Sequence, residues 1–86
     1  SHQTYILGTS WLAMFYLFQG NLEKAHYLYQ NAIEMSNIAG YKVLEMKLLK
    51  NLSQILNSLG ENERALECDE LVKSLSAQSN VDFSLL

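Results

Sequence analysis

A six-residue motif occurs twice in this chain, and the two copies start forty residues apart. The motif begins with Gly, continues with a polar residue, any residue, Glu and a basic residue, and ends with Ala. Each copy follows an apolar helical stretch and opens another. An internal repeat with a period of about 20–50 residues is typical of stacked helical pairs. We therefore expect two copies of one helical hairpin. The motif copies are Gly20-Asn21-Leu22-Glu23-Lys24-Ala25 and Gly60-Glu61-Asn62-Glu63-Arg64-Ala65.

Three glycines divide the chain into four segments of similar length. They stand at positions 20, 40 and 60, and the sequence contains no proline. Glycine is favoured just past the C-terminus of a helix, where a left-handed conformation is needed. In the third segment, apolar residues such as Leu48, Leu52 and Ile55 recur at steps of three and four. We expect helices at about 4–19, 21–38, 41–59 and 62–77.

Short connections between these segments force neighbouring helices to be antiparallel. The sequence thus predicts an all-α fold of two stacked antiparallel hairpins, one at about 4–39 and one at about 41–77. The tail 78–86 either frays or docks as a cap. The length of 86 residues suits one small domain, 1–86. Because the chain begins with Ser1 and not Met, we expect it to be a fragment of a larger protein.

Composition excludes several classes of function. The chain is 49% apolar and carries a formal net charge of −3, which is too apolar for a disordered segment. An acidic balance argues against a nucleic-acid partner, since phosphate binding needs clustered Lys and Arg. One cysteine, Cys68, excludes an internal disulfide and favours a reduced, cytoplasmic environment. No signal peptide is visible, and the apolar stretch 5–18 is shorter than the roughly 20 residues of a membrane span.

Small and aromatic residues recur at a fixed spacing in the first hairpin, at Leu12-Ala13, Tyr16, Gly20, Ala25, Tyr29 and Ala32. This spacing resembles that of the tetratricopeptide repeat. The second hairpin departs more from that pattern, because Asp69 replaces an aromatic residue. No proline closes either repeat, and the period is forty instead of about 34. The resemblance covers residues 6–77 and implies a segment of an α-α superhelix that binds proteins or peptides. The corresponding positions in the second hairpin are Leu52-Ser53, Leu56, Gly60, Ala65, Asp69 and Val72.

In such arrays the first helix of each hairpin lines a concave groove, so the resemblance implies one apolar wall and one basic, amide-rich wall. Lys and amide side chains donate hydrogen bonds to carboxylates, which suits a peptide with an apolar segment followed by an acidic group. The alternative is an ordinary solvated face. The implied walls are Leu7, Ser10, Met14, Leu17 and Phe18 on the first helix, and Lys47, Lys50, Gln54, Asn57 and Ser58 on the third.

The first helix is apolar on every side. Eleven of the fourteen residues from Tyr5 to Phe18 are apolar, and no Asp, Glu, Lys or Arg precedes Glu23. A helix of this kind must be buried all round, and two hairpins alone cannot cover it. We therefore expect preceding repeats, a second copy of the chain or a bound partner to cover it. The candidate partner or self-association residues are Leu7, Trp11, Met14, Phe15 and Phe18.

Residues with catalytic or metal-binding chemistry are sparse. His26 has no second ligand at a metal spacing and is expected on the solvated surface, and Cys68 is expected in the core. The acidic residues of 61–70 suit the positively polarised start of a helix. The sequence therefore predicts no catalytic residue, metal or cofactor, and it favours a non-catalytic protein-interaction module. A ligand- or peptide-sensing regulatory domain and a homo-oligomerisation module are the alternatives.

Overall fold

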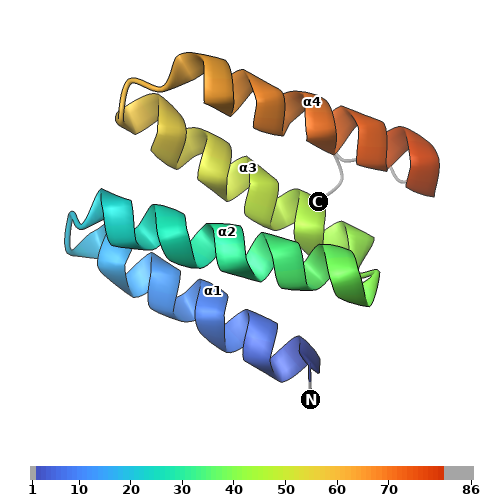
Figure 1. The fold of residues 1–86 in the computed structure, drawn as a ribbon, viewed down its shortest axis with the longest axis horizontal. Helices are drawn as coiled ribbons and strands as arrows, with labels where there is room; N and C mark the ends of the chain where they lie inside the picture. Colours follow the sequence, from blue (N-terminus) through green and yellow to red (C-terminus); the bar gives the residue numbers. More distant parts are fainter. Residues whose placement is uncertain (1, 81–86) are drawn as a thin grey trace.

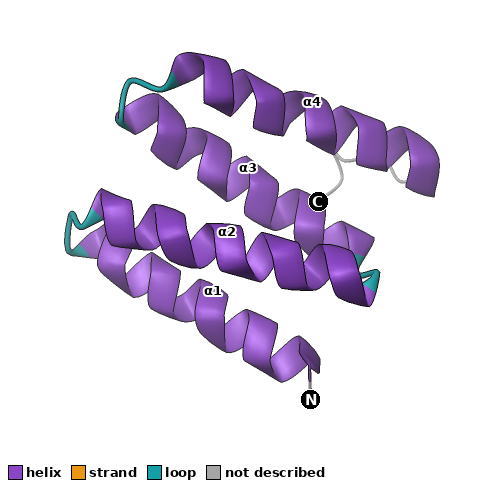
Figure 2. Ribbon diagram, in the orientation of Figure 1, coloured by secondary structure: helices purple, strands orange, loops and turns teal. Residues whose placement is uncertain are grey.

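The computed structural model describes residues 2–80, which form four α-helices joined by short turns (Figure 2). Helices α1 and α2 form hairpin 1, and helices α3 and α4 form hairpin 2. Figure 1 shows α2 and α3 side by side at the centre, with α1 and α4 on the outer sides. This arrangement confirms the predicted all-α fold of two stacked antiparallel hairpins. The helices are α1, His2–Phe18; α2, Leu22–Ala39; α3, Lys42–Ser58; and α4, Asn62–Ser79.

The predicted helix boundaries agree with the structure to within two residues. The largest differences are at the start of α1 and the end of α4, which each extend two residues beyond the prediction. Helix α4 ends where Asn80 adopts a left-handed φ of 57°. The first residues of the predicted tail therefore belong to α4, and residues 81–86 lie outside the described residues.

The repeated motif forms the same turn in both hairpins. Gly20 and Gly60 have φ values of 79° and 78°, which glycine adopts without the steric cost of a side chain. In each turn the next N–H donates to the carbonyl five residues earlier, from Asn21 to Tyr16 at 2.9 Å and from Glu61 to Leu56 at 2.8 Å. These bonds satisfy carbonyls that the end of a helix leaves unpaired and reverse the chain.

Small residues let the two helices of each hairpin pack closely. Ala13 and Ala25 are fully buried between α1 and α2, and Ser53 and Ala65 occupy the equivalent positions in hairpin 2. The Ser53 hydroxyl donates a hydrogen bond to the Ala65 carbonyl at 3.2 Å. A larger side chain at these positions would separate the helices or force strain.

The two hairpins pack through α2 and α3. Tyr29 of α2 is buried, and Asn51 of α3 forms a side-chain hydrogen bond with it. At the other end of this interface, the Asn37 amide donates to a Glu45 carboxylate oxygen at 3.2 Å. Glu45 is itself buried, which the sequence did not indicate, because its amide partner is supplied by the preceding hairpin.

The same Gly→Ala change should have opposite effects at two positions. Gly20→Ala should lower the free energy of unfolding by about 1–2 kcal/mol, because a side chain disfavours the left-handed region. Gly8→Ala should raise it by about 0.5–1 kcal/mol, because Gly8 lies inside α1 and an added Cβ has no atom of the described residues within 4 Å apart from its chain neighbours and the backbone of α1. Urea unfolding of dilute samples measures both values, and changes of the same sign would contradict this account of the turn.

Candidate interaction site

Two hollows lie between residues of α1 and α3. Near the amino ends of both helices, a hollow of about 410 Å³ is lined by Gln3 and Leu7 of α1 and by residues of α3 and the turn before it. Near their carboxyl ends, a hollow of about 370 Å³ lies over Tyr29 and Ile55. We call this surface the α1/α3 groove. Its remaining lining residues are Tyr41, Lys42, Val43, Leu44 and Lys47 in the first hollow, and Met14, Leu17, Asn51, Gln54 and Ser58 in the second.

Only part of the predicted groove lines these hollows. Lys47, Gln54 and Ser58 of α3 do so, as do Leu7, Met14 and Leu17 of α1. Phe18 of α1 lines neither hollow. The other predicted residues of α3, Lys50 and Asn57, are exposed but line neither hollow.

The prediction that Ser10 faces the groove is wrong. Ser10 is buried, and its hydroxyl donates to the Leu7 carbonyl at 2.8 Å. It follows Ile6 by four residues and precedes Ala13 by three, so all three lie on the buried face of α1. The resemblance to a repeat family placed Ser10 by position, whereas helical spacing puts it on the buried face.

Sequence reasoning missed Lys42 and Asn51. Asn51 follows Lys47 by four residues and precedes Gln54 by three, so helical periodicity would have placed all three on one face. The Asn51 side chain also forms a hydrogen bond with the phenol of Tyr29, which lies below the groove. Burial raises the pKa of Tyr29, and its hydrogen bond with Asn51 offsets part of that rise. Asn51 therefore belongs both to the groove and to the interface between hairpins.

The groove has a basic end and a neutral end. Lys42 and Lys47 stand at the first hollow, whereas amide and hydroxyl groups line the second. Among residues 2–80, no carboxylate lines either hollow, and α1 contributes only uncharged side chains to them. Such a surface attracts an anionic group at one end and offers apolar contact and neutral hydrogen bonds along the rest.

A third hollow, of about 600 Å³, lies between α2 and α4. Leu49, Leu52 and Leu56 of α3 are among its lining residues, together with carboxylates from three helices and the Arg64 guanidinium. Sequence analysis did not indicate this hollow, because it depends on how far α4 stands from α2. The carboxylates are those of Glu34, Glu45 and Glu67, so its electrostatic character is opposite to that of the α1/α3 groove.

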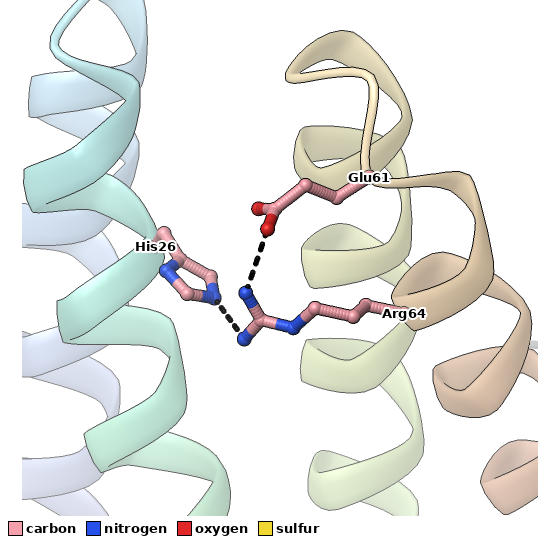
Figure 3. A network of polar contacts seen from close by, with 3 residues as sticks. All are labelled: His26, Glu61 and Arg64. Atoms are coloured by element: carbon pink, nitrogen blue, oxygen red, sulfur yellow. Dashed lines mark hydrogen bonds and ion pairs between the residues drawn. The ribbon is translucent and has the colours of Figure 1, made fainter.

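A polar network joins the hairpins near this hollow, as Figure 3 shows. Arg64 of α4 pairs with Glu61 at 3.0 Å and also reaches His26 of α2, with 3.2 Å between Nη2 and Nε2. Because arginine can only donate, His26 Nε2 accepts this bond and must be unprotonated. Burial lowers the pKa of His26, Arg64 lowers it further, and Glu61 opposes part of this effect. His26 is therefore a contact between hairpins, and the prediction of a solvated surface residue missed that contact.

The remaining candidates for chemistry lie apart from the groove. Cys68 is buried, as expected for a core residue. Burial raises the pKa of its thiol, Asp69 and Glu67 add to the rise, and Arg64 opposes it. In the part of the chain that the structure describes, no three His, Cys, Asp or Glu side chains gather to hold a metal ion, and no helix is long and apolar enough to cross a membrane.

Three of the five apolar candidates of α1 point away from the groove. Leu7 and Met14 line it, whereas Trp11, Phe15 and Phe18 line neither of its hollows. These three rings are 67%, 52% and 81% exposed. The described residues of the two hairpins thus leave this side of α1 uncovered.

Comparison with known proteins yields no relative. No protein-family model matches the chain, and searches of curated proteins and of solved structures found no match to it. The resemblance to the tetratricopeptide repeat therefore depends on the residues alone and stays a prediction.

The His26 contact should make stability depend on pH. The pKa of His26 is lowered in the folded state, so the unfolded chain binds its proton first. The free energy of unfolding should therefore decrease as pH falls below about 6.5, and the full loss is reached below the folded-state pKa. Urea unfolding at pH 7.5 and pH 5.5 measures this decrease. His26→Asn should show a smaller decrease, and an equal or larger one would contradict the assignment.

Proposed function

We propose that the chain is a non-catalytic protein-interaction module that binds an extended peptide in the α1/α3 groove. The observation that carries the proposal is the pairing of two unlike walls along one groove. Helix α1 supplies uncharged side chains, and α3 supplies two lysines and then amide and hydroxyl groups. Both walls belong to rigid helices, so the groove needs little ordering before it binds.

The chemistry of the groove selects the kind of peptide. An acidic group suits the first hollow, where Lys42 and Lys47 supply cations. An apolar side chain suits the second hollow, where Met14 and Leu17 line the wall of α1. The neutral side chains there can pair with the N–H and C=O groups of an extended backbone. We therefore propose that the acidic part of the peptide binds at the first hollow and its apolar part at the second.

We expect this binding to be weak and sensitive to salt. Exposed ion pairs contribute roughly 0–1 kcal/mol each, and salt screens them over a Debye length of about 8–10 Å. The two hollows are each near the lower end of the roughly 300–1,000 Å³ typical of ligand pockets. We therefore expect a dissociation constant between about 1 mM and 1 μM at low salt, which corresponds to about −4 to −8 kcal/mol.

Charge-matched peptides test which surface binds. Two fluorescent peptides share one apolar segment, and one ends in glutamates while the other ends in lysines. Fluorescence anisotropy at low salt should show at least about tenfold tighter binding of the acidic peptide, since about 1.4 kcal/mol corresponds to that factor. The hollow between α2 and α4 carries three carboxylates and should prefer the basic peptide. Equal binding of both peptides would overturn the proposed site.

Two double variants with the same change in net charge locate the binding. Lys42→Glu with Lys47→Glu should weaken the acidic peptide about tenfold or more, because both lysines line the first hollow. Lys50→Glu with Lys73→Glu is the matched control, because these exposed lysines line neither hollow. Circular dichroism should show both variants folded, since Lys42 is the first residue of α3 and an acidic residue is favourable there. Equal losses in both variants would exclude the groove.

A further inference from the structure

Five residues form a stripe along the side of α1 that the described chain leaves uncovered. They succeed one another by four, three, four and three positions, the spacing at which two helices pack along a common seam. The stripe lies opposite the buried face of α1 that contains Ile6, Ser10 and Ala13. We call it the outer stripe, and its members are Thr4, Gly8, Trp11, Phe15 and Phe18.

The face of α3 that is equivalent to the outer stripe of α1 is covered by hairpin 1. The forty-residue repeat relates Gly8 to Leu48 and Phe15 to Ile55. Leu48 and Ile55 of α3 are buried, and Ile55 shares the second hollow of the groove with α1 and with Tyr29 of α2. The equivalent face of hairpin 1 has the geometry of a helix-packing surface, but residues 2–80 leave its three rings between 52% and 81% exposed. The ring contact found there is between neighbours on α1, from Phe15 edge-on to Tyr16 at 5.5 Å.

Side-chain size along the outer stripe is graded. Thr4 and Gly8 are small and lie in the amino-terminal half of α1, whereas Phe15 and Phe18 lie in the carboxyl-terminal half. If two copies of α1 pack antiparallel about Trp11, Thr4 of each copy meets Phe18 of the other, and Gly8 meets Phe15. A parallel pair would place rings against rings and leave a void between the small residues. We propose that the chain forms a two-fold symmetric dimer in which the outer stripes of two copies pack antiparallel.

Gly8 supports this pairing independently. Glycine inside a helix destabilises it relative to alanine, and an added Cβ here has no atom of the described residues within 4 Å apart from its chain neighbours and the backbone of α1. No contact within the described chain therefore requires glycine. A ring packed over this position requires a small residue. Next to Gly8 the surface is hollowed by about 610 Å³, between Tyr5, Leu12 and the α2 residues Leu28 and Met35, among others.

Charge also favours a second copy with the same face. Helix α1 contains no Asp, Glu, Lys or Arg, so two outer stripes meet without repulsion between like charges. A head-to-tail stack would instead place the outer face of α4 on α1. On that face of α4, Asp69 and Lys73 are the repeat equivalents of Tyr29 and Ile33 of α2. Burying these charges without partners is costly. The two-fold pair closes on itself, whereas a head-to-tail stack does not have to close.

The area of the stripe sets the strength of the dimer. A Trp or Phe ring can bury about 150–250 Å², and the exposed fractions of the three rings leave on the order of 300–500 Å² per copy. Two copies then bury about 600–1,000 Å² through the rings alone, and flanking residues such as Leu12 add to this. Stable specific interfaces begin at about 1,200 Å², so we expect a dimer that dissociates on dilution.

Sedimentation equilibrium of the whole chain tests the dimer. The wild-type protein should change from monomer to dimer as its concentration rises from about 1 μM to 1 mM, the range that weak interfaces span. Phe15→Glu should remain a monomer over this range. Leu66→Glu, at an exposed apolar residue of α4, is the matched control and should dimerise like the wild type. A wild-type monomer at every concentration, larger open assemblies, or equal behaviour of the two variants would overturn the proposal.

Disulfide trapping tests the antiparallel order. In a Cys68→Ala background, Thr4→Cys and Phe18→Cys chains are mixed and oxidised. The mixed disulfide should predominate, because residue 4 of one copy meets residue 18 of the other and disulfides need Cα atoms within about 7 Å. A predominance of disulfides between identical variants would overturn the antiparallel order. Circular dichroism should show both variants to be folded, because Thr4 and Phe18 are exposed.

Gly8→Leu separates dimerisation from folding and from peptide binding. It should keep or raise the thermal stability of the dilute monomer, because the position is helical and has free space. It should weaken the dimer about tenfold or more, because the side chain occupies the place of the partner's Phe15. Binding of the acidic peptide should not change, since Gly8 lines neither hollow of the groove. Undiminished dimerisation of Gly8→Leu would overturn the proposed dimer. It would leave the proposed function untouched, because that function is tested by peptide binding.

Discussion

Close packing of the two helices within each hairpin is the constraint on which the rest of the structure depends. It requires small residues at the crossing and a turn that reverses the chain within three residues. Ala13 and Ala25 meet this requirement in hairpin 1, and Ser53 and Ala65 meet it in hairpin 2. The glycine turns supply the reversal. The two hairpins then pack through α2 and α3, and this packing brings residues of α1 and α3 to the same two hollows.

The two copies of the motif share a backbone conformation but use their basic residues differently. Lys24 lies 4.8 Å from the centre of the Tyr16 ring, within hairpin 1. Arg64 instead pairs with Glu61 and reaches His26 in the other hairpin. Arginine can donate in several directions from one planar group, so it can bridge two partners. The glycine that both copies of the motif share thus forms the turn of each hairpin. The basic residue that differs between the copies, Arg64 in the second, helps to join the two hairpins.

The proposed peptide groove and the proposed dimer surface lie on different sides of α1. Leu7 and Met14 line the groove, whereas the rings of the outer stripe are exposed away from it. This division accounts for a helix that is apolar on every side. One face packs against α2, one lines the groove, and one is available to a second copy. A dimer of this kind would leave both grooves open.

Helix positions and the buried stripe of α3 followed from the sequence, because glycine placement and apolar periodicity act locally. That α1 cannot be covered by two hairpins also followed, from its lack of charge. Only the tertiary structure decided that Glu45 is buried against Asn37 and that His26 contacts Arg64. It also decided that Lys42 lines the groove, whereas Lys50 and Asn57 do not. Each of these depends on how one hairpin is rotated against the other, and side chains far apart in the sequence set that rotation.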